Sequence, residues 1–158
     1  MNILSFFDYH TWATEKLLNH LDELPKELFS KEIDSVFHSI KETFEHIYTI
    51  DRLWLDRLQG NNLTMKKVEF LCIEEAKEEF KYLHSHLKRY LEESDIGDVA
   101  VYNNSTGKKF ENKIEDCFIH IINHGTYHRG NITAMIRSLG YKSISTDYIF
   151  YLRSKDQY

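Results

Sequence analysis

Hydrophobic side chains recur at steps of three and four residues along four long segments of the chain, which is the period of an amphipathic helix. The segments cover, in order, about residues 2–23, 35–59, 73–92 and 112–139. Pro25, Gly60 and Gly140 follow three of them as helix-terminating residues. Because each segment has one apolar face, the simplest arrangement that buries all four faces is a four-helix bundle.

Two shorter segments lie outside these helices. Residues 98–110 begin with a β-favouring run and continue into the turn-forming residues 103–107, which predicts a short hairpin or loop before the fourth helix. A short C-terminal helix is expected to begin near Ser145 and to include residues 148–153. The connections between the long helices have about ten residues or more, so they allow long crossovers. We therefore predict an all-α protein with a single domain over residues 1–158.

The composition narrows the class of protein. One proline and six glycines supply too few turn residues for a β-sandwich or β-barrel of 158 residues, which favours helices. The formal net charge is −5, and lysines are interspersed with acidic residues, so no basic stripe is available to neutralise nucleic-acid phosphates. No apolar run approaches the ~20 residues that span a bilayer, and no secretory signal is visible. We expect a cytoplasmic protein that binds neither nucleic acid nor membranes.

The two cysteines have no spacing typical of a metal or redox site. Cys72 and Cys117 lie far apart in the sequence and form no CxxC motif. Reduced cysteines behave as small hydrophobic side chains and are among the most frequently buried residues, and disulfides are rare in cytoplasmic proteins. The expectation is therefore two free and mostly buried thiols.

The segment 118–129, FIHIINHGTYHR, contains three histidines at four-residue spacing. At ~100° per residue, His120 and His128 lie about 40° to either side of His124, on an arc shared with apolar residues. The imidazoles are therefore expected to point into the bundle, where unpaired polar groups cost free energy. Two histidines at i and i+4 can both bind one metal ion at ~2.1 Å. Gly125 stands where the HExxH motif of zinc proteases has its glutamate base, so a metalloprotease is not expected.

A third ligand has to come from another helix. His46 is the leading candidate because it lies at the edge of the apolar arc of the second helix, and His10 on the first helix is the reserve candidate. His38 lies in a more polar run, and His84 and His86 are expected on the solvated side of the third helix. By itself, the HxxxH spacing also fits a surface pair or core histidines that have hydrogen-bond partners.

Residues 123–130, NHGTYHRG, resemble the signature of the DinB-like (damage-inducible protein, YfiT-like) metalloenzyme superfamily. Residues 9–13, YHTWA, resemble its N-terminal YxxWA element, and residues 145–148, STDY, resemble its C-terminal element. Its second-helix element is matched by His46, Asp51, Trp54 and Leu58. The resemblance covers nearly the whole chain, and it implies a four-helix bundle in up-down-down-up order that is often dimeric.

The resemblance also implies a metal site. The family's ligands are one histidine of the second helix and the two of the HxxxH motif, which correspond here to His46, His124 and His128. The residues expected beside the ligands or in the pocket wall are His120, Asp51, Arg129, Tyr127, Trp12 and Asn131. The chain departs from the family pattern at Thr14 and Asn131, where Asn and Gln are frequent, so the family's substrate contacts are not carried over.

Several of these neighbours have two open interpretations. His120 either lies behind the ligands or is simply packed. Asp51 either orients a ligating imidazole through its second ring nitrogen, or is a partly solvated acid or a partner for Arg129. Arg129 itself either receives an anionic group of the substrate or forms a salt bridge. Tyr127 and Trp12 are expected in the core or in the wall of a pocket.

Three neutral imidazoles leave the charge of the ion uncompensated and a coordination position open, which is typical of catalytic metal sites. Such an ion can activate a bound water or thiol without a base from the protein. Branches of the resembled superfamily are transferases and isomerases that use bacillithiol or mycothiol. We therefore expect a metal-dependent transferase that activates a low-molecular-weight thiol for attack on an electrophile, in stress response or detoxification. The alternatives are a metal-dependent hydrolase that uses bound hydroxide and a non-catalytic, metal-stabilised binding protein.

The identity of the metal and the assembly are less constrained. Three histidines suit zinc, nickel, copper or iron, and metal availability often decides among them. Zinc and nickel are the leading expectations. A small-molecule substrate is expected from the open site, and a homodimer is expected from the resemblance alone.

Overall fold

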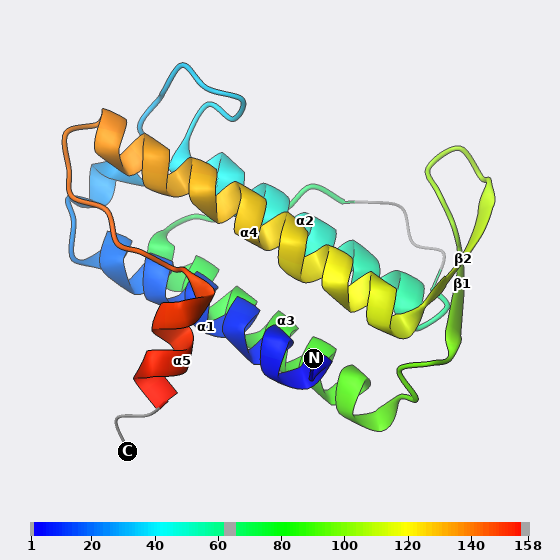
Figure 1. Cartoon of the computed structure of the whole chain (residues 1–158). Helices are drawn as coiled ribbons and strands as arrows, with labels where there is room; N and C mark the ends of the chain where they lie inside the picture. Colours follow the sequence, from blue (N-terminus) through cyan, green and yellow to red (C-terminus); the bar gives the residue numbers. More distant parts are fainter. Residues whose placement is uncertain (1, 62–65, 156–158) are drawn as a thin grey trace.

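The structure, a computed structural model, describes residues 2–61 and 66–155. Its elements are, in chain order, α1 (Ile3–Asp22), the 3-10 turn η1 (Lys26–Leu28), α2 (Ile40–Leu58), α3 (Ile73–Glu93), β1 (Val99–Asn103), β2 (Lys109–Lys113), α4 (Ile114–Ser138) and α5 (Tyr148–Lys155). α1 and α4 run in one direction and α2 and α3 in the other, which is the expected up-down-down-up order (Figure 1). The prediction of an all-α four-helix bundle with a short C-terminal helix is confirmed, and the segment predicted as a short hairpin or loop before the fourth helix is a hairpin.

Each long helix contributes one fully buried phenylalanine to the core. These residues are Phe7, Phe44, Phe80 and Phe118. The rings of Phe7 and Phe118 meet edge to face with their centroids 5.4 Å apart, and those of Phe44 and Phe80 meet in the same way at 5.9 Å. Aromatic pairs in this geometry add to the free energy gained by removing large apolar surfaces from water. The apolar faces predicted from the periodicity are therefore the faces that meet.

The helix ends follow local chemistry. Asn2 caps α1, and its side-chain oxygen accepts a hydrogen bond from the backbone N–H of Leu4 at 3.0 Å. Gly60 and Gly140 follow α2 and α4 with φ angles of 75° and 89°, in the left-handed region that glycine adopts without steric cost. The predicted ends of these two helices are confirmed to within about two residues.

α2 begins at Ile40 rather than near residue 35, so the predicted start is wrong. Ser39 caps the helix because its hydroxyl accepts a hydrogen bond from the backbone N–H of Glu42 at 3.0 Å. The Glu42 carboxylate accepts one in return from the backbone N–H of His38 at 3.1 Å. This arrangement resembles a capping box and ends the irregular segment before it. Val36, a hydrophobic residue of that segment, is 80% exposed.

The hairpin lies where the chain crosses from α3 to α4 (Figure 1). Its strands are antiparallel, with Val99 opposite Lys113. Tyr102 of β1 contacts Trp54 of α2 edge to face, with the ring centroids 5.1 Å apart. The hairpin is therefore packed against the end of the bundle that carries the first residues of α4.

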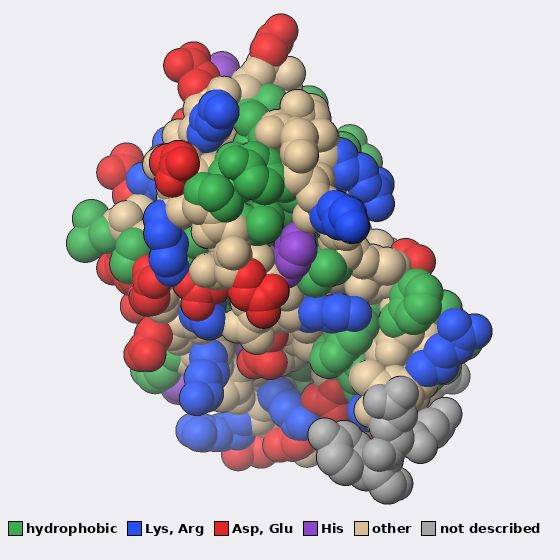
Figure 2. Space-filling model, turned by 90° about the vertical axis from the view of Figure 1, so that its left-hand side faces the viewer, with side chains coloured by type: hydrophobic (Ala, Val, Ile, Leu, Met, Phe, Trp, Pro, Cys, Tyr) green, Lys and Arg blue, Asp and Glu red, His purple; other side chains and the backbone are tan. Residues whose placement is uncertain are grey.

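On the face shown in Figure 2, acidic and basic side chains are interspersed around small groups of hydrophobic ones. None of the helices in the described ranges is long and apolar enough to cross a bilayer. Cys72 and Cys117 are both free. Cys117 is buried as expected, but Cys72 is exposed, because it precedes the first residue of α3 and lies outside the buried stripe of that helix.

We expect Ser39→Ala to lower the free energy of unfolding by about 1 kcal/mol, because the variant leaves an N–H group at the start of α2 without its cap. The measurement is urea unfolding followed by circular dichroism. Ser30→Ala is the matched control, because Ser30 is an exposed serine of the same connection. An equal loss in both variants would contradict the capping role of Ser39.

Candidate metal centre

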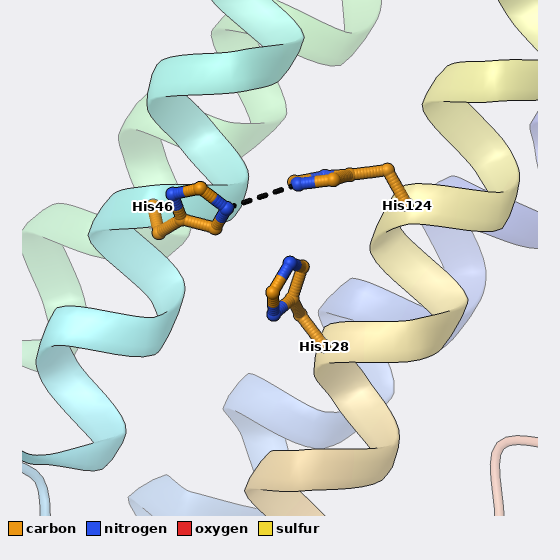
Figure 3. A group of neighbouring side chains, drawn as sticks. All are labelled: His46, His124 and His128. Atoms are coloured by element: carbon orange, nitrogen blue, oxygen red, sulfur yellow. Dashed lines mark hydrogen bonds between the residues drawn. The ribbon is translucent and has the colours of Figure 1, made fainter. Parts of the chain in front are cut away.

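Three histidines from two neighbouring helices meet near the middle of the bundle (Figure 3). His46 comes from α2, and His124 and His128 lie one turn apart on α4. The Nε2 atoms of His46 and His124 are 3.0 Å apart, and one ring nitrogen of His128 points toward the gap between the other two rings. One nitrogen of each ring lies within 4.8 Å of the others. The structure thus brings together the three residues that the sequence assigned to the metal.

The arrangement fits a metal ion. Two nitrogens that bind one ion at ~2.1 Å are about 3.0–3.4 Å apart. The Nε2 atoms of His46 and His124, at 3.0 Å, fall within this range. Without an ion, one of these two atoms must carry a proton to avoid two facing lone pairs. The Nδ1 atoms of His124 and His128 are buried and have no hydrogen-bond partner among the described residues. A ligand set of three imidazoles suits zinc, nickel, copper or iron.

Burial keeps the three rings neutral. Burial, together with a smaller effect from the charge of neighbouring histidines, lowers the pKa of His124 to about 3 and that of His128 to about 4. Burial also lowers the pKa of His46. At neutral pH each ring therefore has a lone pair for a metal ion, and no proton has to be displaced from an imidazolium.

A second polar cluster lies deeper in the bundle and links α1, α2 and α3. The carboxylate of Asp51 accepts hydrogen bonds from His10 Nε2 at 3.0 Å and from His84 Nε2 at 3.2 Å, and the three side chains are at most 2% exposed. The expectation that His84 lies on the solvated side of α3 was wrong. The spacing of Phe80, His84 and Leu87 would have placed it on the buried stripe.

Arg129 determines the protonation of this cluster. Its Nη1 atom lies 3.1 Å from His10 Nδ1, and because a guanidinium only donates hydrogen bonds, Nδ1 must be the acceptor. The proton of the neutral His10 ring is therefore on Nε2, where it is donated to Asp51. Burial lowers the pKa of His10 to about 4, against the opposing effect of Asp51. Burial alone would raise the pKa of Asp51, but the charge and hydrogen bonds of His10 and His84 outweigh it and hold that pKa low.

This protonation argues against a second metal site. The distances in the cluster of His10, Asp51 and His84 would also allow an ion. A protonated Nε2 has no lone pair for a metal, and a dication there would add to the buried positive charge of Arg129. We therefore interpret the cluster as a hydrogen-bonded network, and His10, the reserve ligand, belongs to this network.

Gly125 allows α4 to approach α1 closely. A Cβ atom at this position would lie 2.4 Å from Cε1 and 2.7 Å from Nδ1 of His10, and 2.7 Å from Nη1 of Arg129. Distances this short are incompatible with any side chain unless the network moves. Sequence reasoning used Gly125 only to argue against a protease and missed this packing role.

The structure decides between the interpretations left open for Asp51 and Arg129. Asp51 does not orient a ligating imidazole, because its hydrogen bonds go to His10 and His84. It forms no ion pair with Arg129 in the described part of the chain and interacts with it through His10. Arg129 is 1% exposed and also donates to the hydroxyls of Thr14 and Thr126, so it does not face a substrate.

The remaining expected neighbours are dispersed. His120 is exposed and its ring lies 5.1 Å from that of Trp54 and 6.0 Å from that of His124. Tyr127 is 68% exposed, with its ring 5.0 Å from that of His128. Trp12 packs against the rings of Tyr9 and Tyr151 instead of the site, and Asn131 lines a separate depression next to Met135.

Phe37 is a neighbour of the site that sequence reasoning missed. Its ring lies 4.8 Å from that of His46 and 5.5 Å from that of His128, so it covers one side of the histidine group. The residue lies in the irregular segment before α2. The periodicity extended the helix over this segment, so no sequence signal pointed to its contact with the histidines.

The family model that matches this chain is the DinB family, over residues 1–157. The chain belongs to the DinB family. It is 35% identical over 156 residues to the Protein DinB of Bacillus subtilis (strain 168), with 92% of this chain and 91% of that protein covered. The family assignment confirms the resemblance seen in the sequence.

Solved DinB-like structures share the fold. A DinB-like protein from Bacillus cereus ATCC 10987 matches with a TM-score of 0.70 and 18% identity, over 90% of this chain and 94% of that one. A DinB-like protein from Bacillus subtilis matches with a TM-score of 0.63 and 16% identity, over 92% of this chain and 96% of that one. At these identities the likeness concerns the fold alone.

We expect Gly125→Ala to destabilise this DinB family member by about 1–3 kcal/mol, because the added methyl group displaces His10 or Arg129. Gly130→Ala is the matched control on the same helix, where a Cβ atom meets nothing within 4 Å. It should stabilise by up to about 1 kcal/mol through helix propensity. Urea unfolding measures both, and similar effects of the two variants would refute the close approach of α4 to α1.

The stability of the metal-free protein should fall as the pH decreases from about 6.5 to about 4. His10 and His128 have folded-state pKa values of about 4, below the ordinary value of about 6.5, so the unfolded chain takes up more protons in this window. The measurement is urea unfolding in a chelator at several pH values. His128→Asn should reduce the slope of the free energy of unfolding against pH. A free energy of unfolding that stays constant between pH 7 and 5 would contradict the prediction.

Proposed function

We propose that this protein binds one divalent metal ion through His46, His124 and His128 and activates a low-molecular-weight thiol for attack on an electrophile. The observation that carries the proposal is the convergence of three neutral imidazoles from two helices. None of the three contributes a negative charge, so a bound ion would keep its full positive charge and favour the thiolate form of a coordinated thiol.

The surroundings of the triad support a small-molecule reaction. Phe37 lies against His46 and His128 and limits the access of water from that side. A pocket of about 310 Å³ has His46 in its wall, which is the size of a small ligand site. Phe37 also lines this pocket, so the triad borders a space of this size on the side of His46 and Phe37. Homodimer formation, zinc or nickel as the metal, and a stress or detoxification role remain predictions.

The purified wild-type protein should contain close to one metal ion per chain, and His124→Ala should lose most of it. Elemental analysis of the two proteins measures this directly. His120→Ala is the control, because His120 lies one turn away on the same helix but is exposed. Two ions per chain would instead indicate that the cluster around Asp51 also binds metal.

The metal-loaded protein should accelerate the consumption of small thiols by 1-chloro-2,4-dinitrobenzene, and His124→Ala should abolish the acceleration. The same preparation is assayed on esters, amides and lactones without thiol. If only the esters, amides or lactones were turned over, the protein would be a hydrolase and not a transferase. If metal raised the melting temperature but neither assay showed turnover, the protein would be a non-catalytic binding protein.

A further inference from the structure

The pocket beside the metal centre is built mainly from one face of α2. Its volume is about 310 Å³, and Phe37 and Lys67 complete its wall. The helix contributes residues at i, i+3, i+4 and i+7, which are Glu42, Glu45, His46 and Thr49. His46 belongs both to this wall and to the histidine triad, so the pocket borders the triad on the side of His46.

Glu45 is a buried carboxylate that is only partly paired. It is 3% exposed, and its Oε1 atom accepts a hydrogen bond from the backbone N–H of Phe70 at 2.8 Å. Lys41 Nζ lies 3.7 Å from the same oxygen, beyond hydrogen-bond distance. A carboxylate has about four acceptor positions, so most of this capacity remains for another donor. A cationic donor in the pocket would form a charge-assisted hydrogen bond with it.

Thr49 differs from three other threonines of the helices. Thr14, Thr43 and Thr126 each donate their hydroxyl to the backbone carbonyl four residues earlier. Thr49 lines the pocket and is 7% exposed, but its hydroxyl has no partner among the described residues. An unsatisfied buried hydroxyl costs free energy, which a polar ligand at this position would recover.

The charges of the wall determine the sign of the ligand group. Glu42, Glu45 and the exposed Lys67 line the pocket, so the lining itself carries two carboxylates and one ammonium. Lys41, which is outside the lining, forms an ion pair with Glu45 at 3.7 Å. We infer that the pocket binds the ammonium group of a small aminothiol through Glu45 and Thr49, with the sulfur directed toward the triad of His46, His124 and His128. The inference rests on the proposed function and assigns a class to its thiol.

The test uses the cobalt(II)-loaded protein, in which binding of a thiolate gives a near-ultraviolet charge-transfer band. Cysteamine, 2-mercaptoethanol and 3-mercaptopropionate are the probes, and they differ in carrying a cationic, a neutral or an anionic end. Cysteamine should have a Kd at least about ten-fold below that of 2-mercaptoethanol, as expected for one added hydrogen bond to a charged group. 3-Mercaptopropionate should bind more weakly than either.

The three probes also differ in the acidity of their thiols, which by itself affects binding to the metal. The decisive comparison is therefore between the wild type and Glu45→Gln, each measured with the same probes. Glutamine keeps an oxygen that can accept the hydrogen bond of the Phe70 N–H group, so the fold is expected to be retained. The variant should lose the preference for cysteamine and leave the Kd of 2-mercaptoethanol unchanged. Thr49→Val should reduce the preference without abolishing it. Glu78→Gln, at an exposed position on α3, is the matched control and should change nothing.

Glycine hydroxamate and acetohydroxamate, which bind open metal sites without sulfur, separate this inference from the proposed function. Thiol binding with no change of preference in Glu45→Gln would overturn the ammonium site and leave the thiol function standing. A preference for glycine hydroxamate that depends on Glu45, with no band from any thiol, would support the ammonium site and exclude the thiol. Equal binding of the two hydroxamates by the wild-type protein would overturn the ammonium site without any thiol measurement.

Discussion

The burial of Asp51 constrains the rest of this bundle. Its carboxylate is fully buried on α2 and accepts hydrogen bonds from His10 on α1 and His84 on α3. His10 in turn accepts one from Arg129 on α4, so a single chain of hydrogen bonds joins the four long helices. Breaking a buried charge away from its partners costs several kcal/mol, which makes any other register of these helices unfavourable. The hydrophobic core supplies the burial energy, and this network favours one alignment of the helices.

The same network orients the metal ligands. Gly125 and Arg129 each follow a ligand, His124 or His128, by one residue and are therefore turned about 100° from it around α4. When Gly125 and Arg129 are held against α1, the two histidines are turned toward His46 on α2. The NHGTYHRG segment thus encodes two faces of one helix, and the packing of one face positions the other. This explains why a glycine lies within the segment.

The buried histidines of this protein divide into two groups with different chemistry. His10 donates through Nε2 to a carboxylate and accepts at Nδ1 from a guanidinium, so both ring nitrogens are occupied. Among the described residues, His124 and His128 have no carboxylate partner, and the Nε2 atom of His124 faces that of His46 at 3.0 Å. The environment of the ring, and not the residue type, decides whether a histidine holds the fold together or can bind a metal. The pocket that shares His46 adds two carboxylates, Glu42 and Glu45, beside this second group.

The sequence by itself determined the four helices and the inward-facing histidines of α4, because residues three or four positions apart on a helix are necessarily neighbours. The up-down-down-up order and the complete set of His46, His124 and His128 came from the resemblance to the DinB-like superfamily. The later start of α2 and the burial of His84 have local signals in the sequence, which are the cap formed by Ser39 and Glu42 and the position of His84 on the buried stripe of α3. Only the tertiary structure decided the partners of Asp51 and Arg129 and the contact of Phe37 with the triad. His10 and Arg129 are 119 positions apart, and their contact exists only once α1 and α4 have packed. Periodicity carries no information about which distant residues will meet, because that depends on the packing of whole helix faces.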